Sequence, residues 1–363
     1  MRLMKITALT GSWLRCARDV ALAMMAVAGV SCAVIAQTVL LPPAPGLAAG
    51  SVDTAQPDRG INEWLLRMHE ASRRRAYIGT FVVSSGSSMA SAKIWHICDG
   101  QNQMERVESL SGPPRSTFRR DDQVITFLPE RKHAVAERRE SLGLFPNLLQ
   151  SADSSIAQFY SARLAGHDRV AGFDADMVLL QPKDKLRYGY RVWSEKKTGL
   201  VVKLQTLDID GRVLEQSAFS ELQLDAPVNM NKLNQMMSNT EGYKVDRPEM
   251  IKTTAAAEGW VLKTPVAGFK PMSCFKRPAA APEGSAVDNT MQWIFSDGLA
   301  SVSLFVELFD RRQHGHEGLM ALGATRTITR RIGDWWLTVV GEAPIQTLSA
   351  FAQGLERKKA TPN

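Results

Sequence analysis

The sequence predicts an α+β protein in which a large N-terminal antiparallel sheet forms an unclosed barrel with few covering helices, followed by a smaller C-terminal α+β domain. Three observations predict this fold class. Many short apolar segments alternate with turn residues, few segments have helical periodicity, and a polar stretch divides them into a long and a short series. The length of 363 residues also suits two domains.

Residues 1–49 are predicted to be a signal peptide. An apolar stretch at 20–41 is followed by small and helix-breaking residues at 42–50, and it is preceded by four basic residues, Arg2, Lys5, Arg15 and Arg18. We expect cleavage near Ala48 or Ala49 and export of the rest of the chain. An uncleaved anchor stays open, because about 20 apolar residues can cross a bilayer.

The charge of the exported part is mildly basic. The whole chain carries +7, and residues 1–49 supply +3 of it, which leaves +4. This balance favours acidic partners such as an anionic lipid or an acidic peptide. It is too weak to indicate nucleic acid, so no nucleic acid partner is predicted.

The predicted N-terminal domain spans residues 60–225. It opens with a helix, because Ile61, Trp64, Leu65 and Met68 share one helical face. An antiparallel meander is expected at 77–84, 90–98, 103–110, 115–120, 123–128 and 133–138. After an apolar loop at 143–149 and a short helix at 156–160, more strands are expected at 168–171, 175–182, 186–194, 200–209 and 214–222.

A sheet this broad with so few helices leaves an apolar concavity. The candidate residues for a lipid or peptide groove there are Phe81, Val83, Ile94, Phe127, Tyr188, Tyr190 and Val192. An ordinary core role stays open for each of them. Candidates for contact with lipid phosphates are Arg119, Arg120, Arg138 and Arg139, with solvated strand ends as the alternative.

A linker at residues 226–258 is predicted from mixed polarity and weak periodicity. The predicted small C-terminal domain covers 259–357. Its helix starts at Pro344, a residue that suits a first helical turn. Its strands are expected at 260–264, 269–275, 291–296, 300–309, 325–331 and 335–341.

The sequence lacks the nucleotide-binding, nucleophile-elbow and zinc-protease motifs, so we predict no enzyme, no cofactor and no metal site. Two weaker interpretations concern histidines. The segment 314–317 has two imidazoles and a carboxylate that could hold a metal, but a solvated turn is the favoured interpretation. His96 near Cys98 could suggest a thiol nucleophile, but residues two positions apart merely share a strand face. Cys98 and Cys274 could pair in an oxidising compartment or remain separate buried thiols.

Several short motifs, in this order, resemble the RseB/MucB family. They are E-W-L-L-R-M at 63–68, Y-I-G-T-F-V-V at 77–83, H-I-C-D-G at 96–100, E-R-V-E-S-L-S-G at 105–112 and T-V-V-G-E-A-P at 338–344. The resemblance covers residues 60–355. It implies a large domain similar to lipoprotein carriers, an unclosed barrel with a hydrophobic cavity.

The resemblance also implies a function. The chain is expected to be a periplasmic negative regulator that binds the periplasmic domain of a single-pass anti-sigma factor and shields it from proteolysis. Release is expected when lipopolysaccharide or lipoprotein acyl chains bind, and a homo-oligomer stays open. A periplasmic lipid or lipoprotein carrier is the alternative, and a periplasmic hydrolase using His96 or His314 is a third hypothesis.

Overall fold

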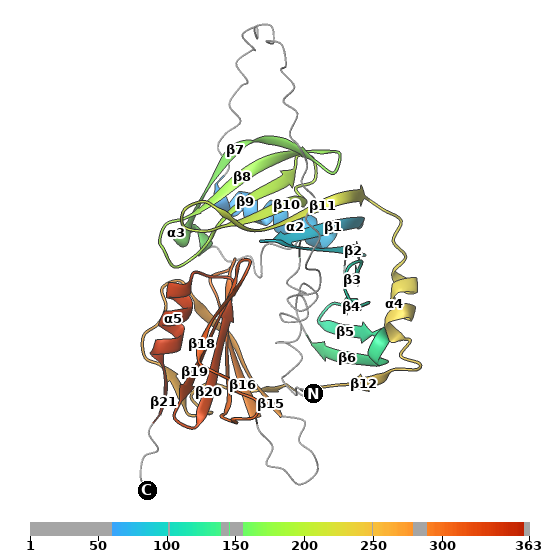
Figure 1. Ribbon diagram of the computed structural model, residues 1–363. Helices are drawn as coiled ribbons and strands as arrows, with labels where there is room; N and C mark the ends of the chain where they lie inside the picture. The colour runs from blue at the N-terminus through green and yellow to red at the C-terminus, as the bar shows by residue number, and fades with distance from the viewer. Residues whose placement is uncertain are drawn as a thin grey trace, which may run out of the picture.

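The computed structural model describes residues 60–100, 102–138, 145, 155–248, 250–278 and 289–358. A large sheet and a smaller sheet lie next to each other, and helices pack on both (Figure 1). The predicted signal peptide and all of the apolar loop 143–149 except Phe145 fall outside the described residues. Within the described ranges, every helix is too short or too polar to span a bilayer.

The large sheet has twelve strands in the spatial order β12-β6-β5-β4-β3-β2-β1-β11-β10-β9-β8-β7. All neighbours are antiparallel except β12 and β6, which are parallel. The strands are β1 (Tyr77–Ser85), β2 (Ser88–Cys98), β3 (Gln103–Ser109), β4 (Ser116–Arg120), β5 (Gln123–Leu128), β6 (His133–Arg138), β7 (Tyr160–Val170), β8 (Phe173–Pro182), β9 (Gly189–Glu195), β10 (Val201–Leu207), β11 (Val213–Leu224) and β12 (Lys244–Asp246). The predicted fold class, a broad open antiparallel sheet with few helices, is confirmed.

Helix α2 (Ile61–Arg74) covers one face of this sheet. Its predicted apolar face is the buried one, with Trp64, Leu65 and Met68 each at most 4% exposed. Arg73 and Arg74 occupy its last turn, where cations are stabilised by the helix dipole. The short helix α3 (Ile156–Phe159) adds the buried Ile156 to the same core.

Helix α4 (Met230–Ser238) contributes to a second core of the large sheet. Its Leu233 is buried with side chains of β3 to β6, including Met104 and Phe118. The segment 226–258, predicted as a linker, therefore holds a packed helix together with β12 and β13.

The C-terminal sheet has seven strands, ordered β13-β15-β16-β17-β20-β19-β18, and α5 (Ile345–Gly354) packs on one face. The strands are β13 (Ile251–Lys252), β15 (Lys270–Pro278), β16 (Asn289–Ser296), β17 (Ser301–Leu308), β18 (Gly318–Leu322), β19 (Thr325–Ile332) and β20 (Trp335–Gly341), and a separate pair is β14 (Trp260–Leu262) with β21 (Leu355–Arg357). Phe351 of α5 anchors this core, with ring centroids 4.8 Å from Phe295 and 5.7 Å from Phe269.

Several strands differ from the prediction. β7 starts at Tyr160 instead of residue 168, and β12, β13, β18 and β21 were not predicted. β7 and β18 are edge strands with mostly exposed or half-buried side chains. Because neither strand buries one continuous face, its sequence lacks the alternation that signals a half-buried strand.

Candidate functional site

Five of the seven residues predicted to line a groove lie together on the α2 face of the large sheet. Four are at most 4% exposed and Val83 is half-buried; the five are Phe81, Val83, Ile94, Tyr190 and Val192. They pack with α2 and with Phe145, whose ring centroid lies 5.7 Å from that of Phe81. These residues form an apolar core that the chain's own side chains cover.

Phe127 and Tyr188 lie elsewhere. Strand pairing aligns Ile94 of β2 with Val107 of β3, and the same row ends at Thr126 of β5. Because neighbouring residues of a strand point to opposite faces, Phe127 points away from the face of Ile94. There it joins the α4 core, 5.0 Å from the ring of Tyr243. Tyr188 is buried just before β9, with the Arg326 guanidinium of β19 5.9 Å from its ring centroid. It therefore marks a contact between the two sheets.

A buried ion pair joins the two domains. Arg187, between β8 and β9, donates from Nε to Asp297 Oδ2 of the C-terminal sheet at 3.0 Å, and both side chains are 0% exposed. Tyr160 donates its hydroxyl to the same Oδ2 at 3.0 Å. Arg187 also pairs with the partly exposed Asp184 at 2.7 Å. We call Arg187, Asp297 and Tyr160 the domain-contact cluster.

The turn between β16 and β17 holds Asp297 in place. Its Oδ1 accepts the backbone N–H groups of Leu299 and Ala300 at 3.0 and 2.8 Å. One carboxylate therefore organises the turn with one oxygen and faces the other domain with the second. An Asp-Gly pair such as 297–298 is typical of a turn between two strands, but no local pattern predicted the contact across the domains.

Residues of both domains surround the Arg187 guanidinium. Arg187 Nη2 donates to the Ala267 carbonyl at 2.6 Å, and its Cζ lies 4.5 Å from the ring centroid of Phe159 and 5.4 Å from that of Phe269. Gly268 has a φ of +83°, and a β-carbon there would meet Nη2 at 2.4 Å. Glycine is therefore required at this position.

Apolar side chains cross the same contact in both directions. Leu299 of the C-terminal turn is 7% exposed and belongs to the core of the large sheet. Leu186 packs against the C-terminal core, and its carbonyl accepts the Thr347 hydroxyl of α5 at 2.6 Å. Because each domain inserts a side chain into the other, the domains interlock around the ion pair.

A second contact pairs two carboxylates across the domains. Gly323, at the β18–β19 turn, lies so close to Ser85 that a β-carbon would meet Ser85 Oγ at 2.1 Å. Glu215 lies next to Gly323, and burial together with the nearby Glu342 carboxylate raises the pKa of Glu215 to about 7. A hydrogen bond from the Ala324 N–H to the Glu215 carboxylate acts in the opposite direction and lowers this pKa. Burial also raises the pKa of Glu342.

Of the predicted histidine and arginine candidates of the large sheet, His96 and Arg119 are engaged within it, whereas Arg120 and Arg138 are exposed and Arg139 lies outside the described residues. His96 is fully buried, its Nδ1 lies 2.7 Å from the Arg75 carbonyl, and its ring stacks on Tyr77 at 4.9 Å. Burial lowers the pKa of His96. Arg119 is 4% exposed and donates to Glu105 at 2.9 Å, so it cannot meet a lipid phosphate as hypothesised. These contacts give both residues structural roles.

The other candidates for chemistry are also structural. His314 Nδ1 accepts the Asp310 N–H at 2.8 Å, and its ring stacks on Trp336 at 5.0 Å. Over the part of the chain that the structure describes, no three His, Cys, Asp or Glu side chains group as metal ligands. Cys98 and Cys274 are free thiols, half-buried and buried, so they do not pair with each other.

Comparison with known proteins identifies both halves of the chain. The model of the MucB/RseB N-terminal domain matches residues 60–237, and that of the MucB/RseB C-terminal domain matches 254–356. The sigma factor AlgU regulatory protein MucB of Pseudomonas aeruginosa is 27% identical over 82% of this chain and 92% of its own length. The sigma-E factor regulatory protein RseB of Haemophilus influenzae is 25% identical over 79% and 88%.

Solved structures give the same result. The crystal structure of MucB in complex with MucA(peri) is 27% identical, covers 82% of this chain and 98% of its own, and superposes with a TM-score of 0.61. The complex structure of Pseudomonas aeruginosa MucA/MucB is 26% identical over 82% and 99%, with a TM-score of 0.62.

Proposed function

The chain belongs to the MucB/RseB family, and from this premise we propose that it binds the periplasmic region of a membrane-spanning anti-sigma factor and shields it from proteolysis. The observation that carries the proposal is the match to both family domains in tandem, together with similarity to a MucB captured in complex with MucA(peri). Binding of this kind restrains a stress response without chemical turnover.

The test is binding and protection. The full-length protein, expressed with its own export segment and purified from the periplasm, is titrated with the periplasmic fragment of the anti-sigma factor encoded in the same genome. We expect a dissociation constant in the micromolar range or tighter, and slower cleavage of the fragment by limited trypsin digestion. Folded protein that neither retains the fragment nor slows its cleavage refutes the proposal.

We propose further that an acyl chain from lipopolysaccharide or a lipoprotein enters the α2 face of the large sheet and releases the partner. One general argument and one observation support this. Each buried methylene contributes about 0.8 kcal/mol, so a short apolar segment can shift an equilibrium. The Tyr190 hydroxyl in this core is buried with no hydrogen-bond partner in the described structure, although buried polar groups normally have one.

The core is also close to the domain contact. The rings of Tyr160 and Tyr190 lie 6.3 Å apart, and Tyr160 bonds to Asp297 of the other domain. A chain that displaces Tyr160 therefore disturbs the domain-contact cluster directly. Lipopolysaccharide added to the preformed complex should release the anti-sigma fragment, whereas detergent micelles of equal concentration should not. Equal release by both refutes the lipid step.

The proposed location is the periplasm, because residues 1–49 have the composition of an export signal. Alkaline phosphatase fused after residue 60 should be active in cells, and an inactive fusion refutes export. The alternative is a simple lipid carrier. A simple carrier needs no second domain, whereas this chain has a C-terminal domain joined to the large sheet by a buried ion pair, so we prefer the regulator.

A further inference from the structure

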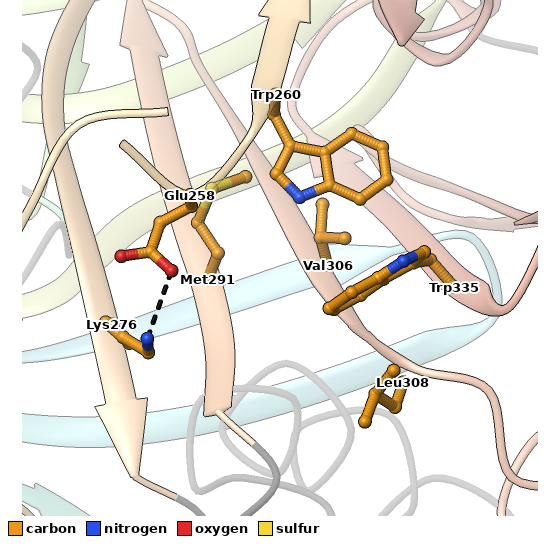
Figure 2. A pocket seen from close by; sticks show the side chains of 7 residues that line it. All are labelled: Glu258, Trp260, Lys276, Met291, Val306, Leu308 and Trp335. Carbon is orange, nitrogen blue, oxygen red and sulfur yellow. Dashed lines mark ion pairs between the residues drawn. The ribbon is translucent and has the colours of Figure 1, made fainter. Parts of the chain in front are cut away.

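The C-terminal domain contains a cavity of about 160 Å³ that the proposed function does not use. Figure 2 shows apolar side chains at its floor, two indoles on one side and an ion pair on the other. The lining residues are Glu258, Trp260, Lys276, Met291, Val306, Leu308 and Trp335. They come from β14, β15, β16, β17 and β20, except Glu258, which lies two positions before β14.

The cavity exists because the helix covers only part of the sheet. Val302, Leu304, Val306 and Leu308 form one row on the α5 face of β17. The first three are 0% exposed, whereas Leu308 at the end of the row is 42% exposed. Helix α5 ends at Gly354, beside the upper part of the strands in Figure 1, so the apolar floor continues past its cover.

The two indoles are held in place before any ligand arrives. Trp260 and Trp335 pack edge to face, with ring centroids 5.7 Å apart. The Arg357 guanidinium lies 4.3 Å from the ring centroid of Trp335 and 5.4 Å from that of Trp260. A wall fixed in this way loses little side-chain entropy when a ligand binds.

The opposite side of the cavity is polar and fixed. Glu258 Oε2 and Lys276 Nζ are 3.1 Å apart, and Glu258 Oε1 accepts the Thr253 hydroxyl at 2.9 Å. The Lys276 side chain is 30% exposed, so a ligand can reach it. An ammonium group has three N–H donors, so Lys276 can donate to a ligand carbonyl while it keeps Glu258.

The size of the cavity selects its ligand. An apolar cavity of about 150 Å³ holds a benzene molecule, so this one takes a single ring or a branched chain of about four to six carbons. A group of this size is shorter than a lipid acyl chain and has about the size of one large apolar side chain. We propose that this tryptophan pocket receives one large apolar side chain of an extended peptide, with Lys276 bonding to the peptide carbonyl.

The tryptophan pocket rests on the proposed function, because the anti-sigma region is the peptide that would occupy it. The first test of the pocket does not need the anti-sigma region. Full-length protein labelled with ¹⁵N-tryptophan is titrated with the acetylated amides of phenylalanine, leucine and alanine, and with decanoate. The indole signals are assigned with Trp260→Phe and Trp335→Phe. We expect both signals to move, with about ten-fold tighter binding of the phenylalanine or leucine amide than of the alanine amide.

Three results overturn the proposal. The indole signals could stay unmoved at saturating amide, they could respond equally to alanine and phenylalanine, or decanoate could bind more tightly than the two larger amides. The last result would make the pocket a lipid site.

A matched pair of variants locates the binding. Leu308→Asp places a charge in the pocket and should weaken amide binding at least ten-fold. Leu319→Asp changes a leucine that is 60% exposed on β18, outside the pocket, and should leave binding within two-fold of the parent. Thermal unfolding checks that both variants fold. If Leu308→Asp does not fold, Leu308→Gln is used in its place. Equal effects of the two substitutions refute the assignment.

The anti-sigma fragment is tested last. If the amides bind and Leu308→Asp blocks them, the pocket stands even where the fragment does not bind at all, and only the proposed function fails. If the fragment binds parent and Leu308→Asp proteins equally, the pocket does not serve this partner and the link between the two proposals is refuted.

Discussion

Replacing Asp297 by asparagine tests whether the domain-contact cluster holds the two domains together. The substitution keeps the size of the side chain and one acceptor oxygen for the Leu299 and Ala300 N–H groups. It removes the charge from Oδ2, which accepts from Arg187 and Tyr160, both at 3.0 Å. The amide nitrogen then places donors opposite donors in a site without solvent.

The cost follows from burial. Removing one partner of a buried ion pair destabilises a protein by about 3–5 kcal/mol, because an uncompensated charge stays behind. Arg187 keeps Asp184 at 2.7 Å, and that carboxylate is 34% exposed. We therefore expect the lower end, about 3 kcal/mol, for Asp297→Asn.

Urea unfolding of the full-length protein, followed by tryptophan fluorescence, measures this loss. Asp184→Asn is the matched control and should cost about 1 kcal/mol, as expected of a partly solvated pair. The double variant Arg187→Met with Asp297→Asn should recover at least half of the loss, because it leaves no buried charge unpaired and keeps an acceptor oxygen for the Leu299 and Ala300 N–H groups. A loss below about 1 kcal/mol for Asp297→Asn, or equal losses for both asparagine variants, contradicts the reasoning.

Three further predictions follow from the same contacts. Tyr160→Phe should cost about 1.5 kcal/mol in urea unfolding, whereas Tyr190→Phe, whose hydroxyl is unpaired in the described structure, should stay within about 0.5 kcal/mol; equal losses would contradict this. Because the folded-state pKa of Glu215 is raised to about 7, its contribution to stability is complete below pH 4 and is lost as the pH rises through 7. Unfolding at pH 5 and pH 8 should show a difference of roughly 1–3 kcal/mol that Glu215→Gln reduces, and an unchanged slope in the variant would count against it. Burial and the Glu258 carboxylate raise the pKa of Cys274 to about 11, so iodoacetamide at pH 8 should modify Cys98 at least ten-fold faster, as measured by mass spectrometry; equal rates would refute this.

The sequence predicted those elements whose burial is local. The face of α2 and the strands β1 to β6 agree with expectation because each buries one regular face and ends at turn residues. Asp210 and Gly211 lie between the strands expected at 200–209 and 214–222, and Gly211 has the φ of +79° that hairpin turns favour. Edge strands such as β18 were missed, because an exposed strand needs no apolar alternation.

The candidate site was harder to predict, because its parts depend on distant residues. Arg187 follows a polar stretch that has the appearance of an ordinary turn, yet its partner Asp297 is 110 positions away. A charged side chain in a sequence looks solvated unless the opposite charge is known to reach it. Local patterns therefore placed Arg187 in the strand expected at 186–194 and Asp297 between two expected strands, and gave no sign of the contact between the domains.

Phe127 shows the same limit for the groove. Three strand pairings, β2–β3, β3–β4 and β4–β5, separate Phe127 from Ile94 in the sheet. The face on which Phe127 lies depends on the register of each pairing. A shift of one residue in any pairing would have placed Phe127 on the same face as Ile94, in the position that Thr126 holds. Apolar character is thus predictable residue by residue, but membership of a common groove is a property of the pairing registers. The residues adjacent to α2 can therefore be tested as a group, whereas a Phe127 variant should affect the α4 core alone.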